Sequence, residues 1–266
     1  MPVDMRELAD DLAAETAALR ELAAGLDVGG WHLLTPAPGW SVGDQLSHLA
    51  FFDDAAIQSA TDPEGFAAET QSAVAAGELT PDAIAERYRS LTGSELLTWF
   101  DASRRRLIKV FAELDPALRL PWFGPPMSAA SSLTARIMET WAHGQDVADA
   151  LAQVREPTSR LRHIAHIGVR ALPYGFAVNG LEVPAEPVRV ELTAPDGQVW
   201  TWGPGHAANR VTGPALDFCL LVTQRRHRAD TAIRAEGQVA AQWLTIAQAF
   251  AGPPGAGRRP GEHGPR

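Results

Sequence analysis

The spacing of apolar residues changes once along this chain, close to Pro184, and that change limits the folds available to it. Before it, residues 3–26 carry leucines at helical intervals, which is typical of an amphipathic helix with one buried face. After it, residues 188–192 alternate with a period of two, and Asp196-Gly197 is a hairpin-turn pair. We therefore expect an all-α part followed by an α+β part.

Start and stop signals divide the two parts into elements. Ser41, with Asp44 three residues later, is close to a capping box, and Asp62-Pro63 ends the helix that it begins. Further helices are predicted from Thr80-Pro81, after Gly93-Ser94, over 128–154 and over 158–171. In the second part we expect strands at 188–192, 199–202 and 232–235, and helices at 212–226 and 239–250.

These elements predict two domains in a chain of 266 residues. The bounds are 1–180 for a helical domain and 185–251 for a small α+β domain. Residues 252–266 are rich in Gly, Pro and Arg without periodicity, which predicts a disordered tail. Apolar residues make up 45% of the chain, enough to form a sizeable core.

Charge and cysteine usage exclude several protein classes. The formal net charge of −9 argues against general binding to nucleic acid or anionic membranes. The basic runs at 104–106 and 225–228 are interpreted as solvated helix faces. No apolar run approaches the roughly 20 residues that span a bilayer, and no secretory signal is visible. Cys219 is the single cysteine, set among apolar residues, which indicates a reducing compartment and a cytoplasmic protein.

The residues that could carry chemistry begin with Glu139 and His143. They lie four apart on a predicted helix, so their side chains share one face and could bind one metal ion. A third ligand must come from another helix, as in metal sites inside helix bundles, and His48 is the best candidate. From spacing alone an exposed hydrogen-bonded pair and a core or capping histidine stay open as alternatives.

The run from Pro38 to Leu49, Pro-Gly-Trp-Ser-Val-Gly-Asp-Gln-Leu-Ser-His-Leu, resembles a signature of the DinB-like superfamily. In its mycothiol-dependent maleylpyruvate isomerase branch, a Glu and a His from a later E-x3-H helix join that histidine. The resemblance covers about residues 4 to 250. It implies an N-terminal DinB-like four-helix bundle, a metal site of His48, Glu139 and His143, and a sterol-carrier-like α+β domain. It also implies a catalytic arginine at Arg225, although the ending differs here from the usual Trp-Leu-Thr-Gly-Arg and Arg226 is the alternative.

Two imidazoles and one carboxylate leave coordination positions open, as in a catalytic zinc site. Zn²⁺ is the first expectation, and Ni²⁺, Co²⁺ or Fe²⁺ would accept the same ligands. With the resemblance, this predicts a mycothiol-dependent isomerase or S-transferase, with mycothiol as cosubstrate and a small electrophile as substrate. A lipid- or small-molecule-binding protein without turnover and a metal-dependent hydrolase are the alternatives, and the chain would be a monomer or homodimer. Asp146 could orient a ligand, while His163 and His166 are interpreted as structural.

Overall fold

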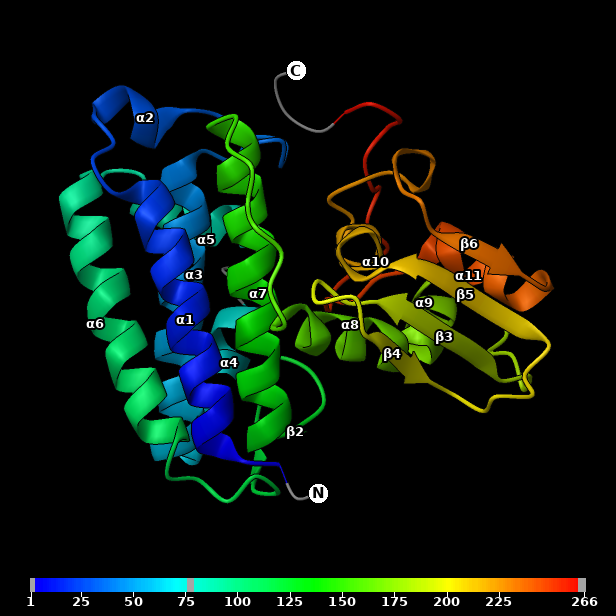
Figure 1. Ribbon diagram of the computed structural model, residues 1–266. Coiled ribbons are helices and arrows are strands. Elements are labelled where there is room, and N and C mark those ends of the chain that lie inside the picture. The colour runs from blue at the N-terminus through cyan, green and yellow to red at the C-terminus, as the bar shows by residue number, and fades with distance from the viewer. Residues whose placement is uncertain (1–2, 76–78, 263–266) are drawn as a thin grey trace. The chain divides into compact units, whose positions relative to one another are not determined.

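The computed structural model in Figure 1 describes residues 3–75 and 79–262, and the chain forms two compact units. The first unit extends to Gln153 and the second begins at Val154. This division falls earlier than the sequence-based bounds of 1–180 and 185–251. The reason is that helix α8 (Leu161–Arg170) packs against α10 (Ala215–Val222) inside the second unit.

Four long helices build the first unit, and they form a closed ring in which α1 contacts α7, α7 contacts α3, α3 contacts α6 and α6 contacts α1. They are α1 (Met5–Ala23), α3 (Val42–Thr61), α6 (Gly93–Phe111) and α7 (Ala129–Ala150). Fully buried leucines and Phe100 fill the space between them. Burying one such side chain contributes about 1.5–3 kcal/mol. The predicted four-helix bundle is confirmed.

Side-chain caps fix where these four helices begin. Each is preceded by a short polar residue whose oxygen accepts from a backbone N–H of the first turn, which satisfies a donor that the helix leaves unpaired. These residues are Asp4, Ser41, Thr92 and Ser128. At Ser41 and Thr92 the box is complete, because Asp44 and Glu95 accept from the cap backbone in return.

Shorter elements connect the long helices. They are α2 (Val28–His32), α4 (Pro63–Ala75), α5 (Pro81–Tyr88), β1 (Arg119–Leu120) and β2 (Met127–Ser128). Thr80 caps α5 with Pro81 in its first turn, as predicted. Helix α4 was not predicted, because up to residue 73, where burial is described, Phe66 is its one large buried side chain. Strands β1 and β2 pair antiparallel and hold the aromatic loop 121–126 between them.

The second unit holds a four-stranded sheet in the order β4-β3-β5-β6, with helices packed on it. Its strands are β3 (Val188–Thr193), β4 (Val199–Trp202), β5 (Asn209–Pro214) and β6 (Arg234–Glu236). Its helices are α8, α9 (Leu172–Val178), α10, the 3-10 helix η1 (Arg228–Asp230) and α11 (Gln238–Ile246). Strands β3 and β4 form the predicted hairpin, β3 and β5 are parallel, and β5 and β6 are antiparallel. The predicted α plus α+β class is confirmed.

Two expectations for the second unit were wrong. The helix expected from Thr212 begins at Ala215, because residues 209–214 pair along the whole of β3 as strand β5. That helix also ends at Val222 rather than near Arg226, because Gln224, just past its end, turns the chain with a φ of 59°.

Of the tail predicted to be disordered, residues 252–262 are irregular chain that includes a hydrogen bond from Gly255 N to Gln248 Oε1 (2.9 Å). Residues 263–266 lie outside the described residues.

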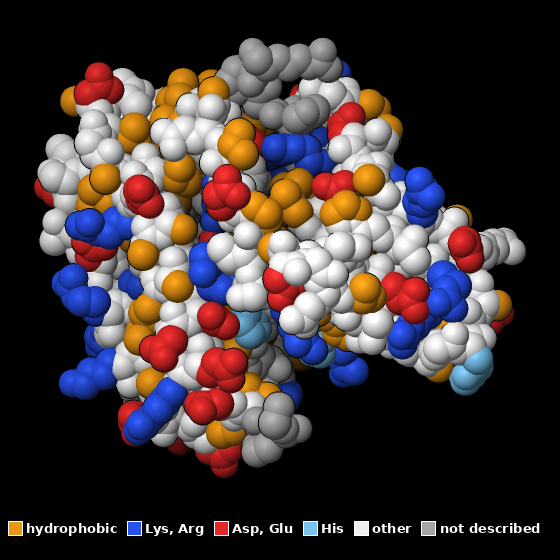
Figure 2. All heavy atoms as spheres, viewed as in Figure 1, with side chains coloured by type: hydrophobic (Ala, Val, Ile, Leu, Met, Phe, Trp, Pro, Cys, Tyr) orange, Lys and Arg blue, Asp and Glu red, His pale blue; other side chains and the backbone are white. Residues whose placement is uncertain are grey.

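The surface of the first unit is mixed in character. Figure 2 shows acidic and basic side chains interspersed over α1 and α6, with hydrophobic side chains scattered between them. Among the described helices, none combines the length and the apolar character that crossing a bilayer requires.

Candidate metal centre

Helix α3 presents His48 to the bundle interior from a firmly fixed start. The capping box of Ser41 and Asp44 begins the helix, and Arg89 donates from Nε to Asp44 Oδ1 at 3.1 Å. His48 follows about one turn after Asp44 and is buried. The local sequence therefore sets both the height and the direction of this imidazole.

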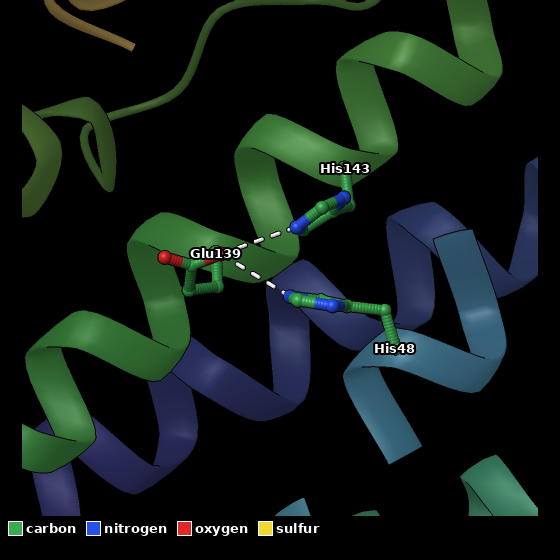
Figure 3. A group of neighbouring side chains, drawn as sticks. All are labelled: His48, Glu139 and His143. Atoms are coloured by element: carbon green, nitrogen blue, oxygen red, sulfur yellow. Dashed lines mark hydrogen bonds and ion pairs between the residues drawn. The ribbon is translucent and has the colours of Figure 1, made fainter. Parts of the chain in front are cut away.

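Helix α7 presents the other two residues on one face. Ser128 caps its start by accepting from Ser131 N at 3.1 Å, and the helix then runs unbroken for 22 residues. Glu139 and His143 lie one turn apart within it and point toward His48 across the gap between α7 and α3 (Figure 3).

The three side chains converge on one point. His143 Nε2 lies 3.1 Å from Glu139 Oε2, and His48 Nε2 lies 3.9 Å from the same oxygen. Each of the three donor atoms lies within 4.8 Å of the other two. Bonds of about 2.0–2.1 Å to a tetrahedral zinc ion place neighbouring donors about 3.3 Å apart. The donor set and its spacing therefore fit a divalent metal ion.

A chain of hydrogen bonds fixes which ring nitrogen of His143 faces the proposed metal position. The carbonyl of Trp40 can only accept, so the Thr35 hydroxyl donates to it (2.9 Å) and accepts from Gln45 Nε2 (2.9 Å). Gln45 Oε1 then faces His143, and His143 Nδ1 donates to it. With Nδ1 donating to Gln45, Nε2 is the ring nitrogen that faces Glu139, and it would supply the lone pair to a metal ion bound there.

Electrostatics keep Glu139 ionised. Burial alone would raise its pKa, but the hydrogen bond with His143, together with the charges of His143, Arg136 and His48, outweighs burial and lowers the pKa to about 2. Only 20% of the Glu139 side chain is exposed. The carboxylate is thus an anion at neutral pH, the state in which it can bind a metal ion.

Aromatic rings surround the two imidazoles. Trp40 stacks near His143 with centroids 6.0 Å apart, and Trp40 Nε1 donates to Asp82 Oδ1 at 2.8 Å. Phe52 lies 4.6 Å from the His48 ring and contacts Phe123 of the loop 121–126. The aromatic side chains of this loop, Trp122 and Phe123, extend the wall that begins at Phe52.

Sequence reasoning missed a buried charge network next to this wall. Arg104, interpreted from the sequence as part of a solvated face, is only 2% exposed and donates to both oxygens of Asp53 (2.7 and 3.3 Å). Arg104 also donates to Thr16 and Thr140. Gln45 and Arg136 were missed as well. Both lie three residues before a metal-ligand candidate, and that helical spacing is the signal that could have found them.

Three further residues from the sequence analysis lie outside the group of three donor residues. Asp146 is fully buried, and its expected role in orienting a ligand stays a prediction. His166 accepts from Trp202 Nε1 (3.3 Å) in the second unit, which suits its structural interpretation. Cys219 is buried and donates to Leu161 O (3.4 Å), and burial raises the pKa of its thiol well above the usual range.

Arg225 lies in the second unit, past the end of α10. Its backbone N–H and that of Arg226 both donate to Leu220 O, and its Nη1 donates to Thr223 O at 2.6 Å. Its catalytic role stays a prediction.

Comparison with known proteins gives matches to both parts of the chain. Residues 12–148 match the family model described as the mycothiol maleylpyruvate isomerase N-terminal domain, and residues 184–235 match a model described as wyosine base formation. Two proteins described as uncharacterized, from Mycobacterium tuberculosis strains CDC 1551 and H37Rv, are each 51% identical over 248 residues. The matches cover 93% of this chain and 96% of each relative.

Two solved structures share the fold. One is a crystal structure of the mycothiol-dependent maleylpyruvate isomerase, with a TM-score of 0.59, and the other is a histidine-to-alanine mutant of it, with a TM-score of 0.58. Both are 16% identical to this chain, and the similarity covers 88% of this chain and 93% of theirs.

Proposed function

Because the chain belongs to the family of the mycothiol maleylpyruvate isomerase N-terminal domain, we propose that it binds a divalent metal ion and activates a low-molecular-weight thiol. His48, Glu139 and His143 are the proposed ligands, and mycothiol is the proposed cosubstrate. The observation that carries the proposal is the convergence of these donor atoms, with the ring of His143 oriented by Gln45. Zn²⁺ is our first choice, and Ni²⁺, Co²⁺ or Fe²⁺ would suit the same donors.

The chain itself supplies no reactive thiol in the described residues. Cys219 is its single cysteine, it is fully buried, and its raised pKa keeps it protonated. The nucleophile therefore has to come from solution. A divalent ion held by the three ligands would favour the thiolate form of such a molecule, which is the reactive form.

The residues around the ligands have defined tasks in this proposal. Glu139 is a single carboxylate, so a divalent ion would keep a net positive charge and attract an anionic sulfur. Gln45 keeps the His143 ring in the orientation that binding requires. The rings of Trp40 and Phe52 exclude water from the flanks of the two imidazoles.

The proposed reaction begins with addition of sulfur to an activated carbon–carbon double bond. A C–S bond forms, and the electron pair of the double bond moves onto the adjoining carbonyl group. In an isomerase, the remaining single bond rotates, the pair returns and the C–S bond breaks, which releases the thiol unchanged. In an S-transferase, the carbon next to the carbonyl takes up a proton and the C–S bond stays. Arg225 is proposed to bind a carboxylate of the substrate through two hydrogen bonds.

The test is turnover by the zinc-loaded protein with mycothiol and either maleylpyruvate or a panel of electrophiles. We expect activity that requires the thiol and is lost in His48→Ala, while the exposed His32→Ala control retains it. Absence of thiol-dependent turnover in the metal-loaded protein would remove the proposal. Activity without any thiol would instead favour metal-dependent hydrolysis, and a co-purified apolar ligand without turnover would favour a binding protein of the sterol-carrier type.

A further inference from the structure

Arg136 is a buried cation for which the described residues provide no hydrogen-bond acceptor. Only 4% of the residue is exposed, and its Nη1 is buried without a hydrogen-bond partner. Asp53 Oδ1 lies 3.8 Å from Nη1, which is too far for a hydrogen bond. A guanidinium carries five N–H donors, and leaving buried donors unpaired is costly.

Asp53 does not supply the acceptor that Arg136 lacks, because both of its carboxylate oxygens already accept hydrogen bonds from Arg104. Arg104 Nε lies 2.7 Å from Oδ2, and Arg104 Nη2 lies 3.3 Å from Oδ1. Two buried guanidinium groups thus share one carboxylate. The nearest other anion along α7 is Glu139, one turn further on, and Glu139 is a proposed metal ligand. With a divalent ion bound, this part of the bundle would hold excess positive charge.

Arg136 lies close to the proposed metal ligands. It precedes Glu139 by three residues on α7, a spacing that puts their Cβ atoms about 5–6 Å apart on one helix face. Its Cζ lies 5.8 Å from the centre of the Phe52 ring, and the same ring lies 4.6 Å from His48. Arg136 therefore lies beside the three donor residues, and its charge acts on Glu139. Glu139, one-fifth exposed, marks a side on which the cluster meets solvent.

We propose that Arg136 binds a carboxylate group of the electrophilic substrate beside the metal ligands. A carboxylate matches the planar fork of a guanidinium with two charge-assisted hydrogen bonds, and it would supply the missing acceptor. This inference rests on the proposed function and adds to it a residue, Arg136, that would position the substrate. The aromatic side chains of Phe52 and Phe123 would contact the apolar part of such a molecule.

The test measures binding of maleate to the zinc-loaded protein by titration calorimetry, without any thiol. Maleamide, which has the same shape and no charge, is the control ligand, and Arg105→Met, at the exposed neighbour of Arg104, is the control variant. We expect Arg136→Met to weaken maleate binding about tenfold or more, since a charge-assisted bidentate contact is lost. Maleamide binding and zinc content should not change. Unaltered maleate affinity in a zinc-loaded Arg136→Met protein would overturn the inference.

A second variant covers the case in which Arg136→Met does not fold. Arg136→Lys keeps the positive charge but loses the planar fork, and we expect it to bind maleate more weakly than the wild type. Equal affinity would show that Arg136 serves only as a counter-charge, and the inference would fall. The result of this binding test is independent of the turnover test of the proposed function. Arg136-dependent maleate binding without thiol-dependent turnover would keep the carboxylate site and remove the proposed reaction.

Discussion

His143 donates a hydrogen bond from Nδ1 to the side-chain oxygen of Gln45, which ties helix α7 to helix α3 beside the proposed metal ligands. Gln45 is itself held by Thr35, so the bond orients the imidazole from a fixed point. Replacing Gln45 by Leu should lower metal affinity about 10- to 100-fold, as loss of an outer hydrogen-bond partner usually does. Competition with a chromogenic chelator measures this.

The control is Gln58→Leu, the same change at a half-buried position on the same helix. Its metal affinity should equal that of the wild type. If Gln45→Leu binds metal as tightly as Gln58→Leu does, the orienting role of Gln45 is wrong.

Glu139 should stabilise the metal-free protein at neutral pH and lose that contribution in acid. Its pKa in the folded protein is about 2, below the ordinary 4.5, so the unfolded chain takes up the proton first as the pH falls. The stabilisation is therefore complete above about pH 5 and disappears as the pH falls toward the folded pKa. Urea unfolding of the wild type and Glu139→Gln should show a difference in unfolding free energy that shrinks on acidification. A difference that stays constant, or grows, from about pH 6 to pH 3 would contradict the assignment.

Arg104→Met should destabilise the protein by about 3–5 kcal/mol, because it leaves Asp53 buried without its main partner. Adding Asp53→Asn to this variant removes the uncompensated charge and should restore part of the loss. Chemical denaturation of the metal-free proteins measures both. Arg105→Met, at the exposed neighbouring position, should stay within about 0.5 kcal/mol of the wild type. Equal losses of unfolding free energy in Arg104→Met and Arg105→Met would show that the Arg104–Asp53 pair contributes nothing to stability.

Cys219 should be inert toward thiol reagents in the folded protein. It is fully buried and its pKa is raised by burial, so little thiolate forms. An aromatic disulfide reagent should modify it only after denaturation, and Cys219→Ala should retain thiol-dependent turnover. Rapid modification of the native protein would contradict this account.

The long helices and two of the three proposed ligands could be predicted because their signals are local. Caps such as Ser41, and the four-residue spacing of Glu139 and His143, act within one helix turn. The resemblance of the run ending at Leu49 then selected His48 as the third proposed ligand, and the structure brings it beside the other two. Strand β5 could not be predicted in this way, because residues 209–214 become a strand by pairing with β3, which lies far away in the sequence.

The buried side-chain networks were missed for the same reason. Arg104 looks like a surface residue in a basic run, and only its contact with Asp53 on another helix shows otherwise. Gln45 reads as an ordinary polar helix residue until His143 is brought beside it. Polar groups buried between helices are defined by tertiary partners, which local patterns do not record.

Metal content per chain tests the central claim most directly. Elemental analysis of the purified wild type, His48→Ala and His32→Ala should give about one divalent ion per chain for the first and last proteins. His48→Ala should bind almost none, since the two ligands left on α7 do not make a tight site. A wild type that takes up no ion, or a His48→Ala protein that holds as much as the wild type, would contradict the account.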